Sequence, residues 1–184
     1  IAISILRILR ESEDSIRRVG MVVGAVVMAT AVWSMHYTGM LAYDMSMNHS
    51  YDPLLTVISG LMAFLFALGV FKLLSQKAVT RRVILLAAPL LGAGVTIMHY
   101  TGMEAMMVDA HLSYKADLYL LSILIAVVAS GAALWIMDHA SRNQHYQQMV
   151  QGAAALILGA GVCGMHYTGM AASVFLPFAN CRFD

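Results

Sequence analysis

Charged residues are scarce in this sequence. Only 11% of its 184 residues are Asp, Glu, Lys or Arg, whereas 60% are hydrophobic. A soluble domain of this length carries about 25% charged residues, so the deficit excludes an ordinary soluble protein and predicts an integral membrane protein whose surroundings are the lipid bilayer. The net charge is only +1, and no basic tract or aromatic-interleaved basic patch occurs, so we expect no nucleic-acid partner.

The usual catalytic sets are also missing. The sequence contains no Ser-His-Asp arrangement, no paired carboxylate dyad and no phosphate-binding loop, so we do not expect an enzyme. Its two cysteines, Cys163 and Cys181, form no disulfide framework, and Cys163 lies in an apolar run where a thiol usually behaves as a small hydrophobe. Without a cysteine pair or a carboxylate triad, nothing favours zinc or iron.

What the chain does contain is long apolar runs. A helix needs about 20 apolar residues to cross a bilayer, and five runs satisfy this requirement. The segment 1–10 would be the end of a sixth helix, so we expect the first helix to be truncated. The linkers are short, which predicts one all-α membrane domain over residues 1–184. The five runs are about 19–43, 54–74, 83–108, 118–138 and 149–176.

The basic residues lie almost entirely at one end of the predicted helices. Nine of the eleven fall on one side, and only Lys115 and Arg182 fall on the other. Because cytoplasmic loops of membrane proteins carry such an excess of Lys and Arg, the basic side is predicted to be cytoplasmic. In a bacterial inner membrane, the opposite side would face the periplasm. The nine are Arg7, Arg10, Arg17, Arg18, Lys72, Lys77, Arg81, Arg82 and Arg142.

One hexapeptide, Met-His-Tyr-Thr-Gly-Met, occurs three times without alteration, at 35–40, 98–103 and 165–170. Each copy lies in the C-terminal half of an apolar run, toward the predicted periplasmic side. An ionisable side chain at membrane depth is costly and indicates a functional site. For one copy, a hydrogen bond between helices would be the simpler interpretation, but three identical copies favour a ligand-binding role.

The repeat is longer than the hexapeptide. His36 and His99 are 63 residues apart, and each unit is an inward helix, a basic linker and an outward helix that ends in the motif. An even number of spans gives parallel repeats about an axis along the membrane normal. We predict a polytopic helix bundle with pseudo-threefold symmetry, its motif helices central and closely packed through glycines such as Gly92 and Gly161. The units are approximately 1–43, 51–108 and 114–176.

Each motif offers an imidazole and a thioether on one helix face, because residues four apart are neighbours. His36 and Met40 form such a pair, and Met35 lies about 100° round the helix from His36. Thioether sulfur selects Cu(I), and imidazole serves either copper state. The sequence therefore predicts a site for one or two copper ions. The nine predicted ligands are His36, His99, His166, Met35, Met40, Met98, Met103, Met165 and Met170.

Four further residues are candidates for a supporting role. The motif tyrosines, Tyr37, Tyr100 and Tyr167, could orient a histidine through a hydrogen bond or take part in redox chemistry, although Tyr is also enriched at membrane interfaces. Glu104 follows Met103 near the outer interface and could be a hard ligand, a counter-charge to a bound cation or a surface acid. We place all four around the copper ligands rather than among them.

These features make the sequence resemble a known family, the MHYT domain, a bacterial integral-membrane sensor module named for the motif. The likeness covers nearly the whole chain: the three motif copies, the Trp-Ser-Met-His approach at 33–36 and the Tyr-Asp-Pro helix start at 51–53. The resemblance implies cytoplasmic output domains that make or degrade cyclic di-GMP, or histidine kinases. It also implies that the motif His, Met and Tyr residues bind copper and sense oxygen, carbon monoxide or nitric oxide.

Other functions stay open. A haem or redox protein would use His and Met as axial ligands, a copper transporter would need ligands at the midplane, and a structural protein would use the motif only to lock helices together. We rank a sensor first because three equivalent His-Met pairs suit small ions better than one macrocycle. Ring nitrogens closer than about 8 Å would permit a shared site, since each metal–imidazole bond is about 2 Å. Homodimerisation also stays open.

Overall fold

Five helices and four short strands make up the described part of the protein. The computed structural model describes residues 14–43, 50–76, 80–108, 110–140 and 147–177. All five helices are long and apolar enough to cross a membrane, which confirms the predicted polytopic bundle. The predicted truncated helix, residues 1–10, lies outside the described residues. The helices are α2 (Asp14–Leu41), α3 (Pro53–Leu74), α4 (Arg81–Glu104), α5 (Ala116–Ala140) and α6 (Gln147–Ala172).

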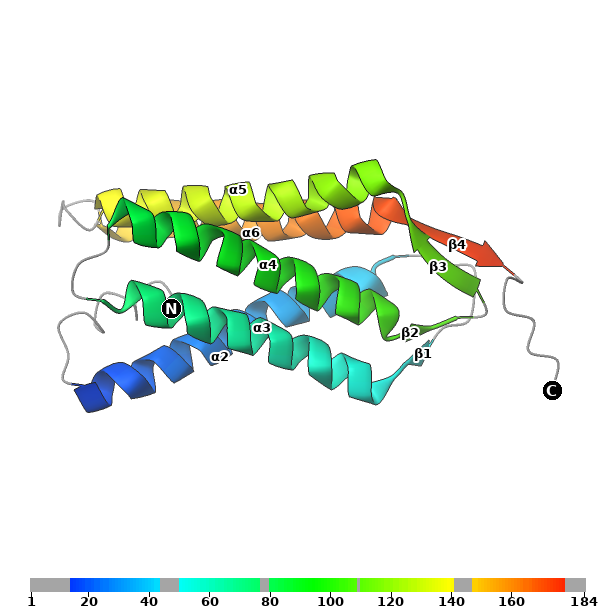
Figure 1. Ribbon diagram of the computed structural model, residues 1–184, viewed down its shortest axis with the longest axis horizontal. Coiled ribbons are helices and arrows are strands. Elements are labelled where there is room, and N and C mark those ends of the chain that lie inside the picture. The colour runs from blue at the N-terminus through cyan, green and yellow to red at the C-terminus, as the bar shows by residue number, and fades with distance from the viewer. Residues whose placement is uncertain (1–13, 44–49, 77–79, 109, 141–146, 178–184) are drawn as a thin grey trace.

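The three motif helices lie at the centre of the bundle. Helices α2, α4 and α6 each contact the other two, while α3 packs against α2 and α4, and α5 packs against α4 and α6. Figure 1 shows the helices running alongside one another over most of the molecule's length. Helix α4 is the most enclosed, with 56% of its apolar stretch buried against 28% in each of the others. The mutual contact of α2, α4 and α6 at the centre is the arrangement that the pseudo-threefold repeat predicts.

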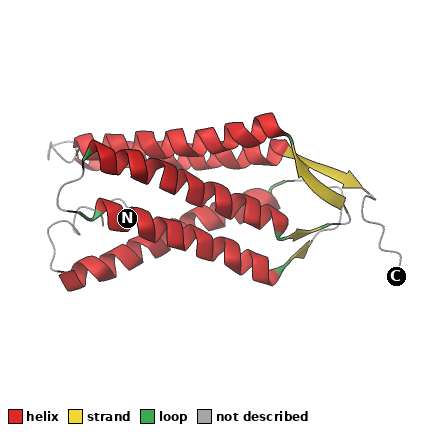
Figure 2. Cartoon of the chain, viewed as in Figure 1, coloured by secondary structure: helices red, strands yellow, loops and turns green. Residues whose placement is uncertain are grey.

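Two small antiparallel sheets lie at one end of the bundle (Figure 2). In the first, β1 (Ser50–Tyr51) pairs with β2 (Met106–Met107), and in the second, β3 (Ala110–Tyr114) pairs with β4 (Ser173–Pro177). The sequence did not predict these strands. The prediction that two helices continue to about residues 108 and 176 was wrong, because α4 ends at Glu104 and α6 at Ala172, and β2 and β4 follow them.

Equivalent hydrogen bonds fix the ends of α4 and α6. The backbone N–H of Asp52 donates to the carbonyl of Ala105 at 2.7 Å, and that of Lys115 donates to the carbonyl of Ala172 at 2.8 Å. The donors are 63 residues apart and the acceptors 67, the same offsets that separate the histidines of successive motifs. Each bond occupies a carbonyl that a helix end leaves without an intrahelical partner. The chain can therefore leave the helix here although its residues remain apolar.

Several glycines allow an outer helix to pack closely against the motif helices. A Cβ on Gly92 of α4 would lie 2.9 Å from the backbone nitrogen of Val127 in α5, and one on Gly161 of α6 would collide with the Cβ of Ala129. The sequence predicted that these glycines lie between motif helices. In the structure they allow α5 to approach α4 and α6, and other glycines bring the motif helices together.

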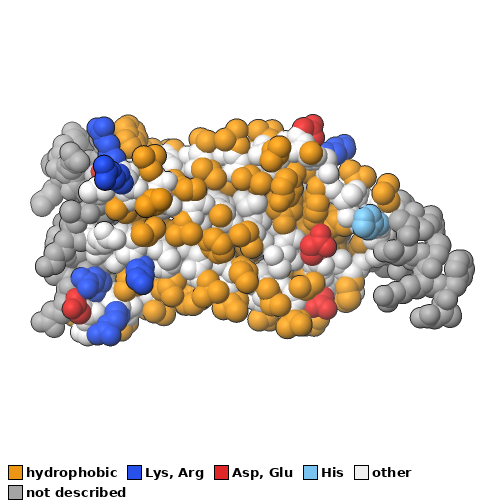
Figure 3. Space-filling model, viewed as in Figure 1, with side chains coloured by type: hydrophobic (Ala, Val, Ile, Leu, Met, Phe, Trp, Pro, Cys, Tyr) orange, Lys and Arg blue, Asp and Glu red, His pale blue; other side chains and the backbone are white. Residues whose placement is uncertain are grey.

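Lys and Arg gather at the end of the molecule opposite the strands, and hydrophobic side chains cover the middle of the face in Figure 3. Arg17 and Arg18 lie near the start of α2, Arg81 and Arg82 begin α4, and Lys72 lies in the last turn of α3. The described basic residues therefore keep the asymmetry that the sequence predicts. We call this the basic end and the opposite one the strand end.

Asp52 caps the N-terminus of α3, and its removal should weaken the fold measurably. Its carboxylate accepts a hydrogen bond from the N–H of Leu55 at 2.8 Å, and Pro53 occupies the first helical position. We expect Asp52→Ala to lower the free energy of unfolding by about 1 kcal/mol, the usual cost of losing such a cap. Denaturant unfolding in detergent would measure it. Asp52→Asn, which keeps an equally good cap, should behave like the wild type.

Candidate metal centre

Residues spaced four apart on the motif helices form three successive layers. Because such residues lie on one helix face, α2, α4 and α6 each present the same three side chains to the centre. All nine are buried, and the three histidines are 0% exposed. From the basic end toward the strand end, these are the valine layer (Val32, Val95, Val162), the histidine layer (His36, His99, His166) and the methionine layer (Met40, Met103, Met170).

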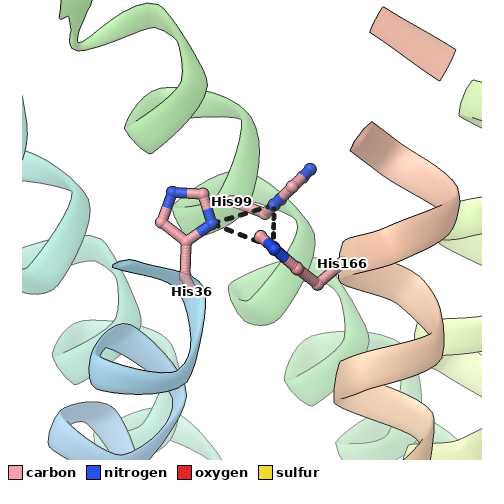
Figure 4. A group of neighbouring side chains, drawn as sticks. All are labelled: His36, His99 and His166. Carbon is pink, nitrogen blue, oxygen red and sulfur yellow. Dashed lines mark hydrogen bonds between the residues drawn. The ribbon is translucent and has the colours of Figure 1, made fainter. Parts of the chain in front are cut away.

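The three histidine rings meet at one point. Their Nδ1 atoms form a triangle with separations of 3.0 Å between His99 and His36, 3.3 Å between His36 and His166, and 3.3 Å between His166 and His99. Figure 4 shows the rings converging from three different helices. Each pair of rings is nearly perpendicular, at 83–87°. These separations are far below the 8 Å limit for a shared site.

Three neutral imidazoles cannot satisfy this triangle with hydrogen bonds alone. In each neutral ring, Nδ1 is either an N–H donor or a lone-pair acceptor. Because three Nδ1 atoms share only these two states, at least two of them must be in the same state. Two lone pairs, or two N–H groups, then face each other at a distance of no more than 3.3 Å. A cation at the centre would accept all three lone pairs and remove the conflict. The geometry therefore fits a metal ligand set better than a hydrogen-bonded lock.

The size of the triangle suits a small metal ion. The Nδ1 atoms are 3.0–3.3 Å apart, and metal–imidazole bonds are about 2.0 Å, so all three nitrogens could reach one shared ion. The three histidines therefore offer three nitrogen donors to a single ion.

A glycine of the neighbouring motif makes room for each ring. A Cβ on Gly102 would lie 2.8 Å from Cδ2 of His36, one on Gly169 would lie 2.9 Å from Cδ2 of His99, and one on Gly39 would lie 2.8 Å from Cδ2 of His166. Each would be closer still to Nε2. The sequence predicted close packing at the motif glycines, but not this cyclic pairing of each histidine with the glycine of the next motif helix.

The six motif methionines are divided between the two sides of the histidine layer. Met40, Met103 and Met170 form the methionine layer and share a buried cluster with Met106. The other three, Met35, Met98 and Met165, lie with the valine layer, where Met98 and Met165 are 0% exposed and Met35 is partly buried. Thioethers therefore lie on both sides of the plane in which the imidazoles meet.

Two of the motif tyrosines, Tyr37 and Tyr100, make hydrogen bonds to serines rather than to histidines. The hydroxyl of Tyr100 lies 2.8 Å from that of Ser122, and the hydroxyl of Tyr37 lies 3.5 Å from that of Ser59. Both serines are fully buried, whereas Tyr167 is 57% exposed. Each tyrosine ring instead packs edge-on against its neighbouring histidine, at centroid distances of 4.8–5.1 Å. The tyrosines therefore support the rings by packing.

Glu104 lies at the exposed rim of the strand end. Its carboxylate accepts a hydrogen bond from the Tyr114 hydroxyl at 3.3 Å. Burial raises the pKa of the Tyr114 phenol, and the neighbouring Glu104 carboxylate raises it further, so Tyr114 stays protonated and donates this bond. The Tyr114 ring in turn contacts Tyr100 at 5.0 Å. Glu104 is thus joined to the histidine layer through two tyrosine rings.

Comparison with known proteins places these features in a signalling context. A family model described as a bacterial signalling protein N-terminal repeat, MHYT, matches residues 30–87 and 92–153. The bifunctional diguanylate cyclase/cyclic di-GMP phosphodiesterase MucR of Pseudomonas aeruginosa is 41% identical over 152 residues, which are 83% of this chain and 22% of MucR. The signaling protein YkoW of Bacillus subtilis is 32% identical over 162 residues, 86% of this chain and 20% of YkoW.

The cyclic di-GMP phosphodiesterase NbdA of Pseudomonas aeruginosa is 33% identical over 156 residues, 83% of this chain and 20% of NbdA. The chain thus spans about a fifth of the length of these relatives. No solved structure matches it.

Proposed function

Since this chain belongs to the MHYT family of bacterial signalling proteins, we propose that it is a sensor domain that binds copper through His36, His99 and His166. It is a multi-pass membrane protein. The observation that carries the copper proposal is the buried Nδ1 triangle, whose sides of 3.0–3.3 Å match one shared ion. The thioethers on both sides of the triangle favour copper over zinc, because soft sulfur ligands select Cu(I).

The proposed signal is copper itself or a diatomic gas, O₂, CO or NO. Bound copper, held by His36, His99 and His166, would supply the chemistry that binds such a gas. A sensor needs a ligand with different affinity for two packings of the protein. Here one histidine comes from each motif helix, so a change in the separation of the rings must move α2, α4 and α6 relative to one another. That movement is the proposed link to the far side of the membrane.

We place the basic end in the cytoplasm and the histidine layer toward the periplasm of a bacterial inner membrane, because Lys and Arg mark the cytoplasmic side. The names of MucR and NbdA include cyclic di-GMP synthesis or degradation. We propose output domains of that kind, on the cytoplasmic side, for the full-length protein. The sensor domain itself then needs no catalytic residues.

Two alternatives fit the site less well. A haem between the histidines is disfavoured because the ring centroids are only 4.9–5.2 Å apart, which leaves no room for a macrocycle. Copper transport is disfavoured because the buried valine layer lies directly on the inner side of the histidines. Beyond this layer and the thioethers that lie with it, the buried core toward the basic end consists of Ala, Val, Phe, Leu and Ile, so an ion moving toward the cytoplasm would meet no further buried histidine or methionine among the described residues.

Copper analysis of the purified chain tests the proposal. Prepared without chelator, the wild type should hold about one copper at the histidine layer, a number that follows from one shared three-imidazole site. The triple variant His36→Ala, His99→Ala and His166→Ala should not hold this ion. His111→Ala, at an exposed position on β3, is the matched control and should keep it. A triple variant that is folded and binds as much Cu(I) as the parent would overturn the proposal, as would a haem absorption band.

A further inference from the structure

A second group of soft ligands lies between the histidine layer and the strand end. It consists of Met40, Met103, Met170 and Met106, which share one buried cluster. Their exposed fractions are 0%, 0%, 3% and 7%. Since Met40 follows His36 by four residues, the methionine layer lies about 6 Å from the histidine layer along the helix axis. We call these four residues the outer methionine cluster.

Met106 is not part of the repeat that supplies the other three. With offsets of 63 and 67 residues, the equivalent positions are 106 − 63 = 43, a tyrosine, and 106 + 67 = 173, a serine. Met106 reaches the cluster from β2, where it lies opposite Tyr51 of β1. Within the described part of the chain, the second repeat thus adds a fourth thioether to a three-thioether layer. Four donors complete a usual coordination number for a small soft ion.

The ligand atoms of the cluster suit a soft cation. Its four members offer thioether sulfur, and apolar side chains, those of Tyr51, Val108, Leu112 and Phe175, pack against them. Divalent calcium, magnesium or manganese would require carboxylate or carbonyl oxygens, whereas neutral thioethers suit Cu(I). A gap-filling role is the plain alternative, because methionine also packs irregular cores.

The outer methionine cluster lies on the side of the histidine layer that faces the strand end. On the inner side of the histidines, Met98 and Met165 lie with the valine layer, and on the outer side the methionine layer covers the histidines. An ion that reaches the histidines from the strand end must therefore pass the thioethers. We infer that Met40, Met103, Met106 and Met170 form a separate, thioether-only site for Cu(I), through which the histidine layer is loaded. This inference rests on the proposed copper function of the histidines.

Ag(I), a monovalent soft ion without redox chemistry at these ligands, is the probe for this site. Silver nitrate would be titrated into the purified chain, with bound silver measured by elemental analysis and its ligand atoms by X-ray absorption. We expect two bound ions in the wild type, one with nitrogen ligands and one with sulfur ligands only. Met106→Leu should weaken the sulfur-bound ion roughly 100-fold, at the upper end of what loss of a supporting group does at metal sites.

Met107→Leu is the matched control, because Met107 is the next residue in β2 and is 49% exposed. It should bind both ions like the wild type. Met106→Leu nearly conserves side-chain volume, so it should cost less than about 1.5 kcal/mol of stability and stay folded. The same variant should also slow the filling of the histidine layer by Cu(I) roughly tenfold, at the lower end of that range.

The outcomes separate this inference from the proposed function. One nitrogen-bound ion, unaffected by Met106→Leu, would overturn the thioether site and leave the histidine site intact. One sulfur-bound ion that Met106→Leu removes would support the thioether site and overturn the histidine site. If both leucine variants bind silver like the wild type and fill with copper at the same rate, the outer methionine cluster is only packing.

Discussion

Gly169→Ala should abolish high-affinity copper binding while leaving the helices intact. The added methyl group would collide with Nε2 of His99 and lie 2.9 Å from its Cδ2. The His99 ring is fully buried, so it can move only by leaving its place in the triangle. Forcing extra atoms into a packed core costs about 1–3 kcal/mol. Displacing one of three donors should weaken copper roughly 100-fold or more, as measured by competition with a Cu(I) chelator.

Gly159→Ala, on the same helix, is the control for this experiment. A Cβ at Gly159 would meet nothing within 4 Å, so the methyl group is accommodated. This change should raise the free energy of unfolding by about 0.5–1 kcal/mol, because alanine is the better helix residue, and should leave copper affinity unchanged. If the two alanine variants bound copper equally well, the cyclic glycine contacts would not shape the site. Gly39→Ala and Gly102→Ala should repeat the Gly169 result.

The bundle and the equivalent placement of the three histidines around one axis could be predicted from the sequence because both follow from periodicity, whereas the sequence left open whether the rings meet. Apolar runs of membrane length fix the helices, and a repeat with an even number of spans puts every motif at the same depth. The offset between His36 and His99 already implies equivalent positions around one axis. Once the motif helices contact each other, residues at the same depth and on the same face must converge.

The details that depend on contacts between elements were beyond the sequence. The pairing of Gly169 with His99 depends on how far one helix is rotated against the next, which no single-helix pattern encodes. Likewise, Ser122 shows the repeat offset from Ser59, but only the packing of α5 on α4 reveals its bond to Tyr100. Hydropathy also could not separate Met106 from the helix before it, because a strand and a helix of apolar residues look alike over such a short run.

Copper should stabilise the wild-type chain far more than it stabilises the His99→Leu variant. A ligand that binds only the folded state adds about 4 kcal/mol of stability at a free concentration 1,000 times its Kd. Losing one of three imidazoles should remove most of this gain. Thermal unfolding of the wild type and His99→Leu, each with and without Cu(I) and in the same detergent, would measure it. His111→Leu, at an exposed position, should gain as much from copper as the wild type.

Without copper, the stability advantage of the wild type over His99→Leu should disappear or change sign. The metal-free wild type holds three Nδ1 atoms of which at least two are alike, and three buried Nε2 atoms without a hydrogen-bond partner among the described residues. In His99→Leu, the Nδ1 atoms of His36 and His166, 3.3 Å apart in the wild type, can become one donor and one acceptor, and one unpaired nitrogen is gone. Since a buried unpaired polar group costs about 1–3 kcal/mol, metal-free His99→Leu should be at least as stable as the wild type. A variant that is destabilised equally with and without copper would instead mean that the histidines only hold the helices together.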